Sequence, residues 1–480
     1  MDAETFRRFG HETVDWVADY LRDVSNYRVL PEVSPGEIRA RLPVAAPEEG
    51  EPMEAILADF RQIILPGVTH WNHPRFFAYF PANHSGPAIL GELLSAALGV
   101  NAMVWQSCPA ATELEEVVME WLRQMLGLPA SFKGVIQDTA STASLVALLC
   151  ARERSTRFRV NTGGFTAGHE EGPLRVYASG EAHSSIEKGL KIAGFGAQNL
   201  THVSVDHDFA MDPRALERCI REDRERGYRP CFVVATIGTT SSTAIDPLAP
   251  IVEIAGRYGL WVHVDAALAG SAAILPEKRW MLEGIAEADS FVFNPHKWLF
   301  TNFDCSAFFC RHPDILRATL TITPEYLRTE QDRVVTNYRD WGIQLGRRFR
   351  ALKLWFVLRY YGIAGLQEML RKHLRLAHEF SRWIEESPEF ELSAPVPLNT
   401  VCFRFIPGRV AGGRPTADDL DRINSELLAA VNRTGRIYMT HTKLRERYCL
   451  RLSIGQIQTG DEDVRQAWET IQQAARTILE

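Results

Sequence analysis

Short apolar segments alternate with amphipathic segments between about residues 90 and 310 of this 480-residue chain. The apolar runs are rich in β-branched and aromatic residues, and the stretches between them repeat their apolar residues at helical spacing. Strands that alternate with helices form mostly parallel sheets with helices on both faces. The sequence therefore predicts an α/β fold with a large, doubly wound, mostly parallel sheet. We expect strands at 174–178, 200–205, 231–237, 260–265, 290–294 and 305–310, and helices at 88–99, 112–126, 141–154, 184–193, 213–226 and 247–258.

The two ends of the chain have different patterns. Residues 1–25 fit an amphipathic helix, and several prolines separate it from the next helix at about 53–64. Near the other end, a helix ends at Gly362 and a later one begins after a Thr416 cap. Strands are expected there at 389–393, 400–406, 436–440 and 448–454. We therefore expect an N-terminal helical segment (1–85), a large α/β domain (86–362) and a small C-terminal α+β domain (363–480).

Charge and cysteine usage argue against several classes of protein. The net charge is −7 with no Lys/Arg-rich run, which gives no reason to expect nucleic acid or an anionic membrane as partner. No apolar run is long enough to cross a bilayer, and the first residues lack the apolar core of a signal peptide. The eight cysteines have no zinc spacing and fit buried thiols in a reducing compartment. We expect a cytoplasmic protein without a metal site.

The segment SFVFNPHKWLF at 290–300 gives the strongest indication of chemistry. A strand-like run leads directly into Lys297, which lies among Phe, Trp and Leu residues. An apolar environment lowers the pKa of a lysine and makes it a better nucleophile toward a carbonyl, as Schiff-base formation requires. On this window alone, a lysine that reaches solvent from a strand end is an equally good interpretation.

A second segment, GLWVHVDAALAGS at 259–271, places Asp265 at the carboxyl end of a buried strand. A buried carboxylate needs a cationic partner, and either a protonated pyridine nitrogen or a structural arginine would serve. The small residues Ala266 and Ala267 would let a flat ring lie close to the backbone.

Three further segments also follow apolar runs. Thr139, Ala140 and Ser141 precede a helix whose free N–H groups suit a phosphate, although Ser and Thr begin many helices. GEAHSSIEK at 180–188 contributes His183, and VVATIGTTSSTAID at 233–246 contributes small hydroxyl side chains. Taken singly, each is as well explained by structure. Together with Lys297 and Asp265 at one sheet edge, they supply the parts that pyridoxal phosphate requires.

These motifs closely resemble those of the aromatic-L-amino-acid decarboxylases, which are pyridoxal-phosphate enzymes of the aspartate-aminotransferase-like fold type I. The resemblance runs nearly end to end. Its most specific parts are AHSS at 182–185, HVDAA at 263–267 and NPHKW at 294–298. The resemblance implies a homodimer with shared active sites, in which N-terminal segments cross between subunits.

The resemblance also implies roles for the matching residues. Lys297 would hold pyridoxal phosphate as the internal aldimine, and Asp265 would pair with the ring nitrogen. Ala267 and His183 would pack on the two faces of the ring, and Tyr326 would return a proton to the α-carbon of the substrate. Thr240 would support the cofactor, and its phosphate would be surrounded by Ala140, Ser141, Asn294 and His296. Trp71, Tyr79 and Phe80 would line the side-chain pocket, and His183 would help orient the substrate carboxylate.

The predicted reaction converts an aromatic L-amino acid to its amine and carbon dioxide. Departures at 82–86 (ANHSG), 100–104 (VNAMV) and Leu268 concern the substrate more than the chemistry. An aldehyde synthase, which couples decarboxylation to oxidative deamination, typically lacks the loop tyrosine. A decarboxylase of acidic or small aliphatic substrates would want basic pocket residues, for which only Arg75 and His84 are nearby candidates. A cofactor-free binding protein is disfavoured by the presence of Lys297, Asp265 and His183.

A last departure lies next to the expected phosphate site. Asp138 precedes the TAS motif at a position where the family commonly has glycine. A second acid beside a phosphate is unfavourable, so we expect the Asp138 carboxylate to point away from it.

Overall fold

The computed structural model describes residues 1–167, 172–322, 331, 334–408 and 415–479. The chain forms two compact units. The first consists of Met1–Pro81, Glu379–Ser393 and Phe403–Glu480, and the second of Ala82–His378 and Ala394–Cys402. The three-part division at residues 85 and 362 stays a prediction. Within the described ranges, no helix is both long and apolar enough to cross a membrane.

A seven-stranded sheet forms the centre of the second unit, with strand order β1-β7-β6-β5-β4-β2-β3. The strands from β6 to β3 are parallel, and β7 is antiparallel to both of its neighbours, β1 and β6. The expected mostly parallel sheet is therefore confirmed. The strands are β1 (Lys133–Gln137), β2 (Leu174–Ser179), β3 (Leu200–Val203), β4 (Arg229–Thr236), β5 (Trp261–Asp265), β6 (Ser290–Phe293) and β7 (Ser306–Cys310).

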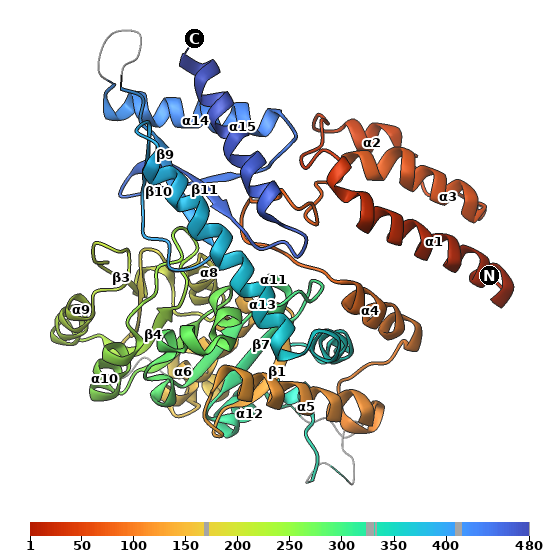
Figure 1. Cartoon of the computed structure of the whole chain (residues 1–480). Helices are drawn as coiled ribbons and strands as arrows, with labels where there is room; N and C mark the ends of the chain where they lie inside the picture. Colours follow the sequence, from red (N-terminus) through yellow and green to blue (C-terminus); the bar gives the residue numbers. More distant parts are fainter. Residues whose placement is uncertain (168–171, 323–330, 332–333, 409–414, 480) are drawn as a thin grey trace. The chain divides into compact units, whose positions relative to one another are not determined.

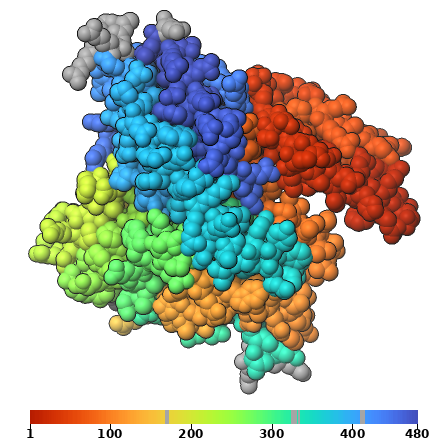
Figure 2. Space-filling view, viewed as in Figure 1, coloured from red at the N-terminus to blue at the C-terminus, as the bar shows by residue number. Residues whose placement is uncertain are grey.

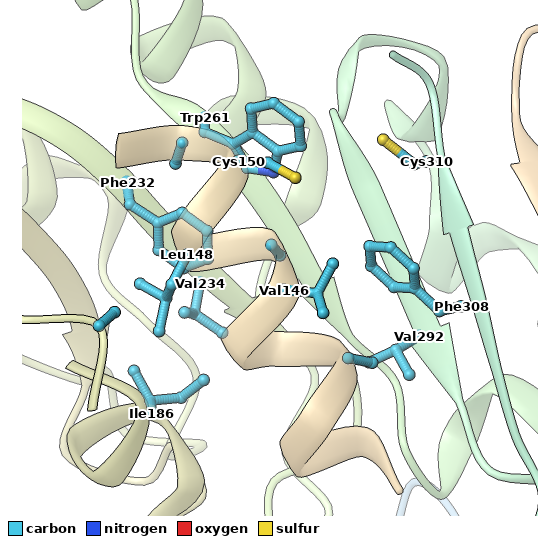
Figure 3. Packing of buried hydrophobic residues seen from close by; sticks show 14 of the residues in the cluster. Val146, Leu148, Cys150, Ile186, Phe232, Val234, Trp261, Val292, Phe308 and Cys310 are labelled. Carbon is cyan, nitrogen blue, oxygen red and sulfur yellow. The ribbon is translucent and has the colours of Figure 1, made fainter. Parts of the chain in front are cut away.

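Helices cover this sheet, and α6 (Ala140–Thr156) packs across its strands (Figure 3). Val146, Leu148 and Cys150 of α6 are fully buried in one apolar cluster with side chains of the sheet. The sheet contributes Phe232 and Val234 from β4, Trp261 from β5, Val292 from β6, and Phe308 and Cys310 from β7. This apolar layer fixes the position of α6, and with it the N-terminus of that helix at the sheet edge.

The other helices of this unit follow the predicted alternation with the strands (Figure 1). They are α4 (Gly86–Leu98), α5 (Pro109–Leu126), α7 (Arg159–Gly163), α8 (Ser185–Ile192), α9 (Pro213–Glu225), α10 (Leu248–Tyr258), α11 (Pro295–Trp298) and α12 (Pro313–Leu320).

A buried ion pair between Glu115 and Arg347 covers the outer edge of strand β1 at Ile136. Glu115 Oε1 accepts the Ile136 N–H at 2.8 Å, and Arg347 Nη2 donates to the Ile136 carbonyl at 2.9 Å. The two side chains are joined to each other at 2.6 Å and are 2% and 8% exposed. The ion pair therefore occupies both backbone groups that Ile136 would otherwise offer to another strand.

The long helix α13 (Arg350–Glu386) contains one non-helical residue, Gly362, with φ 62° and ψ 174°. The predicted helix end at Gly362 coincides with this kink between two helical pieces. A residue without Cβ suits the kink because positive φ is unfavourable for other residues.

The first unit contains the N-terminal helices and most of a four-stranded sheet with strand order β10-β11-β9-β8, of which the first residues of β9 belong to the second unit. The N-terminal helices appear in red and orange in the space-filling view (Figure 2), and Phe6 and Val14 of α1 are 63% and 49% exposed. The predicted cap at Thr416 is confirmed, since Thr416 and Asp419 form a capping box at the start of α14. The elements are α1 (Ala3–Asp23), α2 (Glu37–Arg41), α3 (Met53–Asp59), β8 (Phe390–Leu392), β9 (Thr400–Phe405), α14 (Ala417–Arg433), β10 (Thr440–Leu444), β11 (Arg447–Ser453) and α15 (Asp461–Leu479).

One strand of this sheet lies later in the chain than the sequence predicts. The expected strand at 436–440 is replaced by β10, which pairs with β11 so that Leu444 faces Arg447. The two residues between them, Arg445 and Glu446, have φ values of 49° and 62°. Two positive φ values produce a tight hairpin that Asn or Gly normally marks, so the sequence contains no turn pattern here.

Candidate active site

Three parallel strands of the second unit end side by side at one edge of the sheet. Thr236 of β4 lies opposite Asp265 of β5, and Asp265 lies opposite Val292 of β6. β6 continues directly into α11, which carries Lys297. The sheet therefore brings Asp265 and the Lys297 segment to neighbouring strand ends.

Asp265 is a buried carboxylate, 4% exposed. Its Oδ1 accepts the backbone N–H of Ala267 at 3.1 Å, and Ala267 itself is half-buried. It forms no ion pair with a Lys or Arg of the described residues. The structural arginine considered from the sequence is therefore not found there. An anion in this position is suited to a cation supplied from outside the protein.

His183 lies within electrostatic reach of both Asp265 and Lys297. Burial by the surrounding protein lowers the pKa of His183, Lys297 and Lys188 lower it further, and Asp265 opposes them. Its Nδ1 accepts the Ser185 N–H at 3.2 Å, so the neutral ring carries its proton on Nε2. His183 as a whole is exposed to solvent. The three residues with the most specific motifs are thus gathered at one place.

Asn294 and His296 flank the start of the Lys297 helix and are each 3% exposed. Asn294 Oδ1 accepts the Ser306 hydroxyl at 2.7 Å, and His296 Nδ1 accepts the Cys305 N–H at 2.9 Å. Burial, followed by the charge of Lys297, lowers the pKa of His296 to about 3. The ring is therefore neutral and can donate a hydrogen bond only through Nε2.

Two residues, Asp138 and Thr139, separate the end of β1 from the N-terminus of α6. Thr139 is the N-cap residue, and its hydroxyl accepts the Thr142 N–H. Ala140 is buried, whereas Ser141 is exposed. Asp138 Oδ1 accepts the Thr139 N–H at 2.6 Å, and its Oδ2 lies 3.5 Å from Gln344 Nε2. These contacts give the Asp138 carboxylate hydrogen-bond donors of its own.

Thr240 lies in the turn that follows β4 and is exposed. Two hydrogen bonds hold this turn in place. Thr239 Oγ1 accepts the Ala244 N–H at 3.0 Å, and Cys402 Sγ donates to the Ser241 carbonyl at 3.2 Å. Thr240 is therefore a surface residue on a well-anchored turn.

A buried network beneath the site was not foreseen from the sequence. His263 points to the same face of β5 as Asp265, and its Nδ1 and Nε2 lie 2.9 Å and 3.1 Å from the hydroxyls of Ser290 and Ser144. Burial lowers the pKa of His263 to about 4, so its ring is neutral. The network links α6, β5 and β6, the elements that lead to Ser141, Asp265 and Lys297.

Comparison with known proteins gives this geometry a chemical context. The family model described as the pyridoxal-dependent decarboxylase conserved domain matches residues 35–406. The chain belongs to the pyridoxal-dependent decarboxylases. It is 44% identical to the aromatic-L-amino-acid decarboxylase of Bos taurus, covering 100% of this chain and 98% of that one. It is 42% identical to a phenylacetaldehyde synthase of Arabidopsis thaliana, covering 100% and 97%.

The structure of this decarboxylase also matches that of a solved relative. The crystal structure of Oryza sativa TDC with PLP and tryptamine has a TM-score of 0.96 and 37% identity, covering 100% of this chain and 99% of that one. The expected fold type I, the pyridoxal-phosphate cofactor and the carboxy-lyase class are therefore confirmed.

The residues of this decarboxylase fit the cofactor. Asp265 offers a buried anion to a protonated ring nitrogen, Lys297 offers an amine to an aldehyde, and the α6 N-terminus offers N–H groups to a phosphate. When bound, pyridoxal phosphate supplies the electron sink for the electron pair that stays on the α-carbon when carbon dioxide leaves. Among the described residues, no group of His, Cys, Asp or Glu side chains could hold a metal ion.

Four predicted site residues are not among the described residues of the second unit. Trp71, Tyr79 and Phe80 belong to the first compact unit, where Trp71 stacks on Tyr79 with ring centroids 5.6 Å apart. The Arg451 guanidinium lies 4.6 Å from the Phe80 ring centroid. Tyr326 lies outside the described residues. The roles of these four residues stay predictions.

Proposed function

We propose that this decarboxylase converts an aromatic L-amino acid to the corresponding amine and carbon dioxide. The observation that carries the proposal is the end-to-end similarity to relatives named for aromatic substrates, among them the bovine enzyme at 44% identity. Two aromatic side chains of the predicted pocket, Trp71 and Tyr79, are 36% and 51% exposed in the chain. Exposed aromatic faces can bind an aromatic ring by area burial and offset stacking.

Each residue of the site has a part in this proposal. Asp265 would pair with a protonated ring nitrogen of the cofactor, and the Lys297 amine would anchor the cofactor through its aldehyde. His183 and Ala267 hold the ring from its two faces, and His183 orients the substrate carboxylate. Thr240, Ala140, Ser141, Asn294 and His296 hold the rest of the cofactor, and Trp71, Tyr79 and Phe80 bind the substrate side chain.

Arg75 and His84, the two basic residues considered as partners of an acidic substrate, are not suited to bind one. Arg75 already donates to Gln466 Oε1 at 2.7 Å and to the Arg436 carbonyl at 3.0 Å, and it pairs with Asp463 at 3.6 Å. Burial lowers the pKa of His84 to about 4, so its ring is neutral near pH 7. These contacts support an uncharged substrate side chain.

The proposal extends to a cytoplasmic homodimer with shared active sites. Leu90, Leu93, Leu94 and Leu98 on α4 are 47–60% exposed. A row of exposed leucines on one helix supports a contact with a second copy of the chain. Light scattering of the purified protein measures the mass in solution, and a monomer at micromolar concentration would contradict this part.

The first test identifies the product. The protein with added pyridoxal phosphate is incubated in air with a panel of L-amino acids that includes glutamate and histidine, and products are identified by mass. We expect one aromatic amine to form in preference. Lys297→Ala is the control, because without this amine both turnover and the covalently bound chromophore are expected to be lost.

Other products would indicate a different reaction or a different class of substrate. An aromatic aldehyde with hydrogen peroxide would indicate the activity named in the Arabidopsis relative, and amine from glutamate alone would contradict the aromatic pocket. Tyr326→Phe tests the proposed proton donor, since its loss is expected to shift product from amine toward aldehyde. If that variant makes only amine at the normal rate, Tyr326 is not the donor.

A further inference from the structure

Residues Ala82–Ser85, which precede α4, lie along the segment that carries Lys297. We call these four residues the strap. The Asn83 N–H donates to the His296 carbonyl at 2.9 Å, and Asn83 Nδ2 donates to the Lys297 carbonyl at 2.6 Å. The Ser85 hydroxyl donates to the Phe300 carbonyl at 2.8 Å. Three hydrogen bonds therefore join the strap to three residues of the segment 296–300 around the lysine.

The strap supplies donors where the local backbone lacks them. α11 has only four residues, so the carbonyls at its end have no helical N–H to accept. Asn83 serves two of them in succession, at His296 and Lys297. Phe300 has a φ of 52°, an unfavourable value for a bulky residue, and its carbonyl is the one that Ser85 holds. Without the strap, the carbonyls of His296, Lys297 and Phe300 would lose these hydrogen-bond donors.

The strap acts without bringing a charge to the lysine. Asn83 and Ser85 are neutral and each 2% exposed, and His84 between them is 9% exposed. Burial lowers the pKa of His84 to about 4, so this ring is also uncharged near pH 7. The strap can therefore influence Lys297 through the position of its backbone and not through an electric field.

We propose that Asn83 is a positioning residue that fixes the backbone of Lys297, and hence the direction in which its amine is presented to the cofactor. The inference rests on the proposed function of Lys297 as the cofactor anchor. It gives the departure ANHSG at 82–86 a role in placing the lysine, whereas the sequence alone suggested an effect on substrate choice. A lysine with a loosely held backbone would still react, but more slowly.

The test measures how fast the lysine forms its bond to the cofactor. Pyridoxal phosphate is added to the full chain from which it has been removed, and the covalent chromophore is followed by stopped-flow absorbance. We expect Asn83→Ala to slow its formation about tenfold, because misplacement of a reacting group is costly in rate. In steady state, kcat should fall by a similar factor while KM for the substrate changes little.

The matched control is Asn199→Ala. Asn199 Nδ2 donates to the Phe195 carbonyl at 2.7 Å in the same unit, so it loses a similar bond away from Lys297. We expect chromophore formation at the unaltered rate in this variant. If both variants slow equally, or if Asn83→Ala reacts like the unaltered chain, the strap does not position the lysine. An unaltered chain that forms no chromophore would instead contradict the proposed function.

A second variant covers the possibility that Asn83→Ala does not fold. Asn83→Asp keeps the size of the side chain and the backbone N–H bond to His296, but an ionised carboxylate cannot donate to the Lys297 carbonyl. Chromophore formation should be slow at pH 8, and its rate relative to the unaltered chain should recover at lower pH, where the introduced carboxyl is protonated and can donate. A relative rate equal to one at every pH would overturn the proposal.

Discussion

Asp265 and Asp246 are two buried carboxylates near the ends of adjoining strands, yet their surroundings differ. Asp246 is 1% exposed, and its two oxygens accept the backbone N–H groups of Met211 and Thr236, both at 2.7 Å. Asp265 is 4% exposed and accepts a single N–H, that of Ala267, at 3.1 Å. In the part of the chain that the structure describes, neither pairs with a Lys or Arg.

The difference separates an acid whose oxygens are both engaged by the backbone from the one that we propose pairs with the cofactor. Burial raises the pKa of Asp246 to about 7, although its two N–H donors oppose the shift. This acid can therefore accept a proton, and both of its oxygens are already used by the backbone. Asp265 has one oxygen engaged by Ala267 and is left to pair with a cation from outside. Two buried acids are thus distinguished by how many backbone N–H donors they already accept.

The largest expected effect is on activity. Asp265→Asn should lower kcat/KM for amine formation by about a thousandfold, because an amide cannot stabilise a protonated ring nitrogen. The free energy of unfolding should change by less than about 1 kcal/mol, since the amide oxygen can still accept the Ala267 N–H. Steady-state kinetics and urea unfolding measure the two quantities. Near-normal turnover would remove Asp265 from the proposed mechanism.

Asp246→Asn should produce the converse result. One of its two N–H donors would face the amide NH₂, so the free energy of unfolding should fall by about 1–3 kcal/mol. The folded protein should retain turnover close to that of the unaltered chain. The same urea titration and kinetics test this variant. If it loses activity as Asp265→Asn does while remaining as stable as the unaltered protein, the two acids are not distinguished as we propose.

The last expected effect is the pH dependence of stability. Because the pKa of Asp246 is about 7 in the folded chain and its ordinary value is 3.8, the folded chain binds more protons between these values. The contribution of Asp246 to the free energy of unfolding is therefore largest below about pH 4. It decreases as pH rises to 7, by about 1.4 kcal/mol per pH unit at most.

Buried histidines give the opposite slope. Burial lowers the pKa of His263 and His84 to about 4, so their contribution is lost as pH falls below 6.5. The difference in unfolding free energy between the unaltered chain and Asp246→Asn isolates the Asp246 part. This difference should shrink as pH rises from 5 to 8. A constant difference would show that Asp246 does not titrate in that range.

The parts of this molecule that follow from local pattern could be predicted from the sequence. The β2, β4, β5 and β6 strands and the start of α14 appear as periodic apolar runs or caps of a few residues. Lys297 and Asp265 could be singled out because a charged residue at or shortly after the end of a buried strand is unusual. The strand order, with β7 antiparallel between β1 and β6, required the structure.

Contacts between distant segments could not be foreseen. Asn83 and Lys297 are 214 residues apart, and Ser144 and His263 are 119 residues apart. Asn, Ser and buried His are common residues whose partners depend on how the chain folds back. Asp246 was part of a segment noted for its hydroxyl residues. Its two backbone donors, however, come from separate parts of the chain: Met211 lies between β3 and α9, and Thr236 ends β4. The hairpin at Arg445 and Glu446 likewise has no marker in its residue types.

The buried pair of Glu115 and Arg347 at the outer strand has a consequence for crowded solutions. A strand from another molecule that tried to extend the sheet beside β1 would have to displace a 2.6 Å ion pair held in the protein interior. Ile136 has no backbone group left to offer such a strand. At this point the sheet is protected against the edge-to-edge growth through which exposed strands begin fibrils.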